Sequence, residues 1–260
     1  MKRTAFSLVE LSIVLVILGL LTGGILAGQS LIRAAELRAV STEYARWVTA
    51  TQSFRDKYFQ LPGDMNNAQS FWGAPGTGTC PTGTMTGTQT CNGNGDWHID
   101  PAAAASQSGE MATYWQHLAN AGLIEGTYTG VMGAGSSQET DIRVNTPPSK
   151  MNSAGWSVQY IGVLTNGNFM NIGDYGNVLF FGAAASSQKT FAPILKPEEA
   201  WNIDTKLDDG KPGTGKVMTL KTSSPSWATG CATNDNGDGT NAYALSTTSI
   251  VCPLIFVRAF

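Results

Sequence analysis

The chain has 260 residues, only 13% of them charged, and a formal net charge of −3 at pH 7. Such a chain carries no cluster of basic residues of the kind that binds nucleic acid, so we expect no nucleic-acid partner. Its length allows an amino-terminal anchor followed by one domain of about 200 residues, or a small domain with insertions.

The amino-terminal segment predicts a membrane span. Lys2 and Arg3 precede a mostly apolar stretch that covers residues 6–27, and roughly 20 such residues are enough to cross a bilayer as a helix. A cleaved secretory signal fits less well, because the apolar run is longer than is usual and lacks small residues at a suitable cleavage point. By the positive-inside rule the amino end stays in the cytoplasm and the rest of the chain lies outside it.

Glu10 is a carboxylate near the start of this apolar segment. A charge inside the bilayer costs about 2.5–3.5 kcal/mol and normally marks a function. No basic residue follows within one helical turn, so its partner is either the lipid headgroup region or another molecule. The simpler alternative is an ordinary anchor helix in which Glu10 extends to the membrane surface.

The residues Ala5-Phe6-Ser7-Leu8-Val9-Glu10, between a short basic leader and an apolar helix, resemble the processing motif of type IV prepilins and type II secretion pseudopilins. The family more often has Gly at the position of Ala5. The resemblance implies that a prepilin peptidase cuts between Ala5 and Phe6 and methylates the new amine of Phe6. It also implies that Glu10 pairs with the terminal amine of a neighbouring subunit during assembly, so that two buried charges compensate each other.

The helix is predicted to continue beyond the membrane segment to about residue 60. Apolar and aromatic residues recur there every three or four positions, as on one face of an amphipathic helix: Leu37, Val40, Tyr44, Trp47, Thr51, Phe54 and Tyr58. This face either packs on the chain's own domain or forms a seam between subunits. Pro62 and Gly63 are expected to end the helix.

Residues 61–260 are expected to form an extracytoplasmic head, which follows a leader at 1–5 and the helix at 6–60. The segment from residue 63 to residue 100 is rich in Gly, Thr, Asn and Pro and predicts loops. A second helix is expected within 101–124, and strands within 153–164, 177–184, 216–221 and 250–260. The predicted fold is α+β: a long amino-terminal helix, membrane-spanning then amphipathic, packed on a small antiparallel sheet with long disulfide-bonded loops.

Four cysteines outside the cytoplasm suggest two disulfides, which can be connected in three ways. We expect neighbour pairing, Cys80 with Cys91 and Cys231 with Cys252, because each pair encloses a Gly- or Asn-rich loop. A zinc site is disfavoured, since no two cysteines have the short spacing that zinc sites use.

Two further stretches suggest ligand sites but are incomplete. Residues 210–216 match most of a phosphate-binding loop, yet Val217 replaces the Ser or Thr that contacts magnesium, so we expect a turn. Residues 234–239 match the start of a calcium loop, but Leu245 stands where the closing Glu belongs. The oxygens of Asn92, Asn94 and Asp96 also form an incomplete set. Ordinary turns are the preferred interpretation; calcium stays open by analogy with some pseudopilins, and no other cofactor is expected.

The sequence gives little support to catalysis. It has two histidines, His98 and His117, and neither of the common hydrolase motifs G-x-S-x-G and H-E-x-x-H. We expect His117 at a helix surface or at the edge of the core. The acidic pairs 198–199 and 208–209 are expected to be solvated, and we do not expect an enzyme.

The predicted function is that of a structural subunit of a type IV pilus-like filament, a minor or specialised one because the head is large. The expected partners are prepilin peptidase, other pilin or pseudopilin subunits, the inner-membrane assembly machinery and, before assembly, membrane lipid. The protein would be a single-pass protein of the bacterial inner membrane before it enters a periplasmic or extracellular filament.

Three alternatives remain at this stage. The first is a type II secretion pseudopilin. The second is a membrane-anchored extracytoplasmic binding or adhesion protein whose tryptophans bind a sugar or a surface: Trp72, Trp97, Trp115, Trp156, Trp201 and Trp227. The third is an exported hydrolase that uses its acidic residues.

Overall fold

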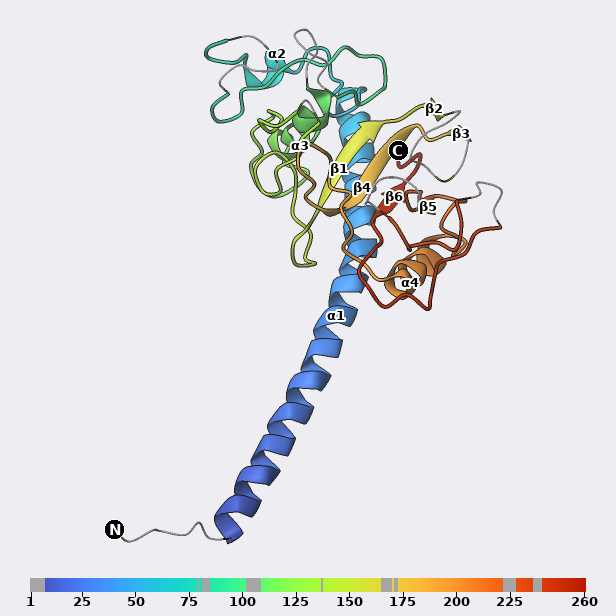
Figure 1. Ribbon diagram of the computed structural model, residues 1–260. Helices are drawn as coiled ribbons and strands as arrows, with labels where there is room; N and C mark the ends of the chain where they lie inside the picture. Colours follow the sequence, from blue (N-terminus) through green and yellow to red (C-terminus); the bar gives the residue numbers. More distant parts are fainter. Residues whose placement is uncertain are drawn as a thin grey trace.

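The computed structural model describes residues 8–78, 80, 85–101, 109–136, 138–164, 170, 173–221, 228–235 and 240–260. A single long helix, α1, runs through the molecule: its carboxyl-terminal half packs into a head, and its amino-terminal half extends away from that head (Figure 1). The predicted leader, including Ala5, and the predicted new terminus Phe6 lie outside the described residues.

Helix α1 comprises Leu8–Tyr58, 51 residues in all, and therefore extends over roughly 75 Å at the usual rise per residue. No proline interrupts it. We call residues 8–32 the arm, because they precede Arg33, whose side chain is hydrogen-bonded to Glu199 of the head. The predicted long apolar helix is confirmed.

The amphipathic face predicted for the second half of α1 packs on the chain's own head. Four of its seven residues are buried, and the other three pack at the edge of the core. Trp47 meets Trp115 edge to face, with ring centroids 5.3 Å apart, and Tyr44 stacks on Phe256 at 4.4 Å. Aromatic pairs of this kind add to the stabilisation from area burial.

The end of α1 differs slightly from the prediction, which placed it near residue 60. The helix ends at Tyr58, and Phe59 takes a left-handed conformation with φ +57°. The Phe59 N–H still donates to the Arg55 carbonyl at 2.8 Å, as in a helix cap. Gly63 follows with φ +86°, a conformation that glycine adopts without steric cost.

The head contains a four-stranded antiparallel sheet in the order β1-β4-β6-β5. Its strands are β1 (Ala154–Tyr160), β4 (Asn177–Ala183), β5 (Val217–Met218) and β6 (Leu254–Phe256). A two-stranded sheet, β2 (Val163–Leu164) with β3 (Gly173–Asp174), adjoins them in sequence. All four predicted strand regions contain a strand, so the small antiparallel sheet is confirmed.

Three short helices complete the described secondary structure: α2 (Gln69–Trp72), α3 (Glu110–Asn120) and α4 (Pro197–Leu207). Helix α3 lies in the predicted region, although residues 102–108 are outside the described part, and Gly122 follows it with φ +73°. Helix α4 was not predicted. It packs against α1 at the base of the head (Figure 1).

Both disulfides join cysteines that are neighbours in sequence. Cys80 bonds to Cys91, and Cys231 bonds to Cys252, which is the pairing expected from the sequence. The first bond closes the loop that follows α2, and the second ties a loop to the segment just before β6. Closure of such loops restricts the unfolded chain and so favours the folded head.

Candidate functional site

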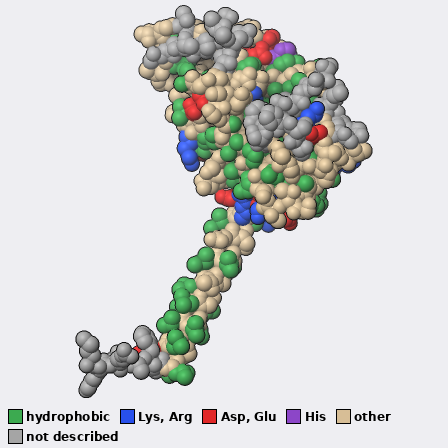
Figure 2. All heavy atoms as spheres, viewed as in Figure 1, with side chains coloured by type: hydrophobic (Ala, Val, Ile, Leu, Met, Phe, Trp, Pro, Cys, Tyr) green, Lys and Arg blue, Asp and Glu red, His purple; other side chains and the backbone are tan. Residues whose placement is uncertain are grey.

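The arm has an exposed apolar surface. The large apolar side chains between Leu8 and Ile32 are all at least half exposed, from 50% at Ile17 to 84% at Leu8. Figure 2 shows hydrophobic side chains recurring along the arm. Full burial of an exposed side chain of this kind gains about 1.5–3 kcal/mol, and covering these partly exposed side chains gains a corresponding part of it. Helix α1 is also the one described helix that is long and apolar enough to cross a membrane, so lipid or other helices are suitable partners for the arm.

The polar residues of the arm suit an apolar environment. The hydroxyls of Ser12, Thr22 and Ser30 donate to backbone carbonyls one turn earlier, each at 2.9 Å. They therefore need no water. Glu10, in the first turn of α1, is the only ionisable side chain between residues 8 and 32. The relation between Phe6 and Glu10 that the resemblance implies involves residues outside the described part.

The arm meets the head at a network of charges. The Arg33 guanidinium donates to both carboxylate oxygens of Glu199, at 2.6 and 2.7 Å, and also to the Ile194 carbonyl at 3.2 Å. A fourth contact joins Arg33 to Glu36 at 3.0 Å. Charged side chains gather at this junction in Figure 2. The bidentate pair fixes α4 on α1 at the point where the arm begins.

Glu199 thus differs from the expectation that residues 198–199 would be solvated. Burial acts to raise the pKa of its carboxyl, but hydrogen bonds from Arg33 and from the Lys196 N–H keep this pKa below its usual range. The pKa of Arg33 is raised, chiefly by its hydrogen bond to Glu199. No sequence signal links Arg33 to Glu199, because 166 positions separate them.

One group of carboxylates joins Asp64, Asp96 and Glu110, whose oxygens lie within 4.8 Å of one another. The sequence indicated only Asp96 of these three. Asp64 accepts three backbone N–H groups, from residues 95, 96 and 97. Glu110 accepts two more from the same loop, at 3.0 and 2.9 Å. Burial raises the pKa of Asp64, although these N–H donors oppose the rise. These N–H donors tie the loop to the carboxylates of Asp64 and Glu110, so the two carboxylates shape this loop.

A second group contains Asp204, Asp208 and Asp209. Asp204 is buried, and it accepts the Tyr243 hydroxyl at 2.9 Å and the Gly210 N–H at 3.1 Å. Burial raises the pKa of Asp204 to about 7; the two hydrogen bonds oppose the rise and the neighbouring carboxylates add to it. Removing a carboxyl from water disfavours its charged form, which explains the direction.

This pKa predicts a pH dependence of stability. The unfolded carboxyl ionises near its ordinary pKa of about 4, whereas the folded one stays protonated up to about 7. Between these values the unfolded chain holds fewer protons, so the free energy of unfolding falls as pH rises from 4 to 7. We expect Asp204→Asn to remove this fall and to be more stable than the wild type at pH 8. Urea unfolding at pH 4.5, 6 and 8 measures the free energy of unfolding of both proteins. If this free energy changes equally with pH in the wild type and in Asp204→Asn, Asp204 does not cause the pH dependence.

The sequence led us to expect His117 at a helix surface or at the edge of the core, but it lies inside the core. Its side chain is completely buried, and burial lowers its pKa to about 3. Nδ1 accepts the Gly63 N–H at 2.9 Å, and Nε2 lies 2.9 Å from the Thr90 hydroxyl. An imidazole that is neutral at pH 7 and hydrogen-bonded at both nitrogens serves as a structural link. His98 is partly exposed and stacks on Tyr160, with ring centroids 3.6 Å apart.

The stretch that resembled a phosphate-binding loop forms a turn. In the segment 210–216, Asp209 accepts the Lys211 N–H at 2.9 Å and the Thr214 hydroxyl at 2.6 Å. These bonds define a tight turn. Of the calcium-like segment 234–239, residues 236–239 lie outside the described part.

The tryptophans do not form one common face. Trp115 and Trp156 are fully buried in the core, and Trp72 is partly buried beside Phe54. Trp97 and Trp201 are exposed, on different elements, and Trp227 lies outside the described residues. The prediction of a binding face built from all six tryptophans is therefore wrong for Trp115 and Trp156, which are buried. Trp97 and Trp201 are exposed.

No family model matches the chain, and no curated protein or solved structure matches it. The molecule combines an apolar arm that contains a single carboxylate with a head that is joined to α1 by partly buried hydrogen bonds and ion pairs.

Proposed function

We propose that the protein is a structural subunit of a type IV pilus-like filament, and that its arm mediates assembly. The observation that carries the proposal is the continuity of α1, which is exposed and apolar over residues 8–32 and enters the core of the head without a break. An apolar surface of this kind is unfavourable in contact with water, so another apolar surface must cover it. Lipid covers it before assembly, and the arms of neighbouring subunits cover it in the filament.

Two further features support the proposal. The residues from Ala5 to Glu10 resemble the prepilin processing motif. The arm also contains Gly19, Gly23, Gly24 and Gly28, where an added Cβ would meet nothing in this chain. Small residues let helices approach closely in an apolar environment. We infer that prepilin peptidase processes the protein and that it leaves the inner membrane when it joins the filament, as a minor or specialised subunit.

The proposal has a close variant and a different alternative. A type II secretion pseudopilin would use the arm in the same way, in a periplasmic filament. A membrane-anchored extracytoplasmic binding protein would instead keep the arm in lipid permanently. Two exposed aromatic residues beside the last turns of α1, Phe59 and Trp97, favour this alternative. The carboxyl end of α1 lies at the end of the head opposite the arm (Figure 1), so a binding surface there would be accessible far from the membrane.

Recovery in sheared filaments separates a filament subunit from an anchored protein. Cells that express the native protein are sheared, intact cells are removed, and the filaments are collected by ultracentrifugation. We expect the protein in the filament pellet, free of an unrelated inner-membrane marker. If the protein is found only together with the membrane marker, both in the material from sheared cells and in the periplasmic fraction, the proposal is overturned.

A further inference from the structure

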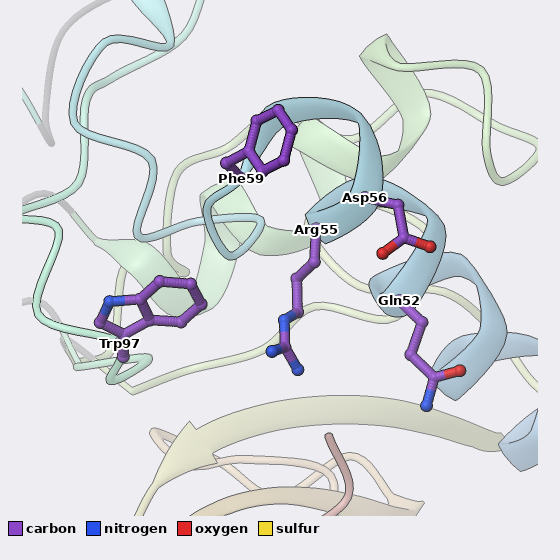
Figure 3. A pocket seen from close by; sticks show the side chains of 5 residues that line it. All are labelled: Gln52, Arg55, Asp56, Phe59 and Trp97. Carbon is purple, nitrogen blue, oxygen red and sulfur yellow. The ribbon is translucent and has the colours of Figure 1, made fainter.

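A groove lies between the last two turns of α1 and the loop that contains Trp97, at the end of the head opposite the arm. Its lining consists of Gln52, Arg55, Asp56, Phe59 and Trp97, and its volume is about 680 Å³. Small-molecule sites in proteins commonly have volumes of about 300–1,000 Å³. In Figure 3, Arg55 lies between Trp97 on one side and Gln52 and Asp56 on the other, with the Phe59 ring above.

The exposed ring of Trp97 is held by buried groups. Trp97 has φ +72°, a conformation that residues other than glycine rarely adopt, and its side chain is 49% exposed. Its N–H donates to the Asp64 carboxylate at 2.8 Å, and its carbonyl accepts the Asn177 side-chain amide at 3.0 Å. Asp64 and Asn177 are both buried. Backbone strain persists where the surroundings enforce it, and such positions cluster at functional sites.

Phe59 shows the same combination of strain and exposure. It occupies the left-handed position after α1, where glycine is usual, and its side chain is 81% exposed. A phenyl ring there costs backbone energy and exposes apolar surface, so it does not serve the stability of the head. Two of the six described non-glycine residues with positive φ thus line one groove.

The polar side chains of the groove have unused hydrogen-bonding capacity. The Arg55 guanidinium lies 5.5 Å from the centre of the Trp97 ring. Across the described part of the chain, the side chains of Gln52, Arg55 and Asp56 form neither an ion pair nor a hydrogen bond. A guanidinium, an amide and a carboxylate together supply planar donors and acceptors. The charges of Arg55 and Asp56 are opposite, so the groove carries no net charge, which suits a neutral ligand.

We propose that this groove binds a neutral sugar, a hexose or N-acetylhexosamine unit of a glycan. The apolar C–H face of such a sugar stacks on an aromatic ring, for which Trp97 is the platform and Phe59 the second wall. Its hydroxyls pair with planar groups such as those of Gln52, Arg55 and Asp56. The site would face away from the arm, so the inference holds equally for a filament subunit and for an anchored protein.

Binding is tested with the full chain in phosphatidylcholine nanodiscs, because detergents with sugar headgroups would compete. The probe is a printed array of mono- to trisaccharides of glucose, galactose, N-acetylglucosamine and N-acetylgalactosamine. Titration calorimetry then measures the affinity of the strongest ligand. We expect Trp97→Ala and Arg55→Ala each to weaken binding at least tenfold, and Trp201→Ala, which removes an exposed tryptophan on α4, to leave it unchanged.

Phe59→Gly separates binding from folding. Glycine suits the left-handed conformation at this position, so we expect the melting temperature to stay equal or to rise while sugar affinity falls at least tenfold. The proposal is overturned if no array sugar binds the wild type, or if binding is unaffected by Trp97→Ala. It is also overturned if Trp97→Ala reduces self-association of the protein without any sugar binding, because the groove would then be a contact between subunits.

Discussion

Replacement of Glu10 by alanine is expected to abolish recovery of the protein in sheared filaments, with at least a tenfold loss, while its amount in the membrane fraction stays the same. Glu10 is the only ionisable side chain of the arm. A carboxylate in an apolar environment is costly unless a cation compensates it. Alanine removes this cost, so insertion into the membrane does not suffer. What is lost is the pairing with a cationic group of a neighbouring subunit, which we propose to be the amine of Phe6.

Matched variants of the arm make this result specific. Glu10→Asp keeps the charge on a shorter side chain and should retain part of the assembly. Ser12→Ala removes a polar group two positions away whose hydroxyl donates to the Val9 carbonyl of its own helix, and this variant should assemble like the wild type. If Glu10→Ala is recovered in filaments as well as the wild type, Glu10 has no role in assembly and the arm is a simple anchor.

The second large effect is expected at Glu43, which links α1 to the sheet. Glu43 is only 7% exposed. Its carboxylate accepts the Ser149 hydroxyl and the Lys150 N–H, both at 2.7 Å, and the Trp156 indole N–H at 2.8 Å. Glu43→Ala leaves the buried Trp156 indole N–H and the two less buried donors of Ser149 and Lys150 without their acceptor, and a buried unpaired donor costs about 1–3 kcal/mol. We expect the free energy of unfolding to fall by about 3 kcal/mol.

Urea unfolding of the full chain, with both disulfides intact, measures this change. Glu43→Gln keeps the size of the side chain but loses one acceptor. Its decrease in the free energy of unfolding should therefore lie between zero and that of Glu43→Ala. Glu125→Ala is the control on a nearly fully exposed carboxylate, 3.9 Å from Arg46, and a surface pair of this kind contributes at most about 1 kcal/mol. A loss at Glu43→Ala no larger than at Glu125→Ala would show that Glu43 does not hold the helix to the sheet.

The architecture was readable from the sequence wherever hydrophobic periodicity is strong. The recurring apolar positions from Leu37 to Tyr58 correctly identify the face of α1 that packs on the head. The apolar runs that contain Trp156, Phe180 and Ile255 correctly identify strands. Periodicity works here because these segments bury one face, or both faces, in a common core.

Other features escaped prediction for physical reasons. Helix α4 is short and polar, and its start signal, Pro197 followed by two glutamates, is not accompanied by a strong apolar pattern. His117 was misplaced because α3 is buried on all sides rather than on one. The contacts of Arg33 with Glu199 and of Glu43 with Trp156 join residues more than 100 positions apart, and a single sequence holds no signal for such pairs.

The proposed function depends most directly on how the amino terminus is processed. We would determine the mass and the amino-terminal sequence of the native protein from cells with and without an active prepilin peptidase. The proposal predicts a terminus at N-methylated Phe6 when the peptidase is active and an uncut chain when it is not. An intact Met1 in both cells, or a terminus near Gly28, would contradict it.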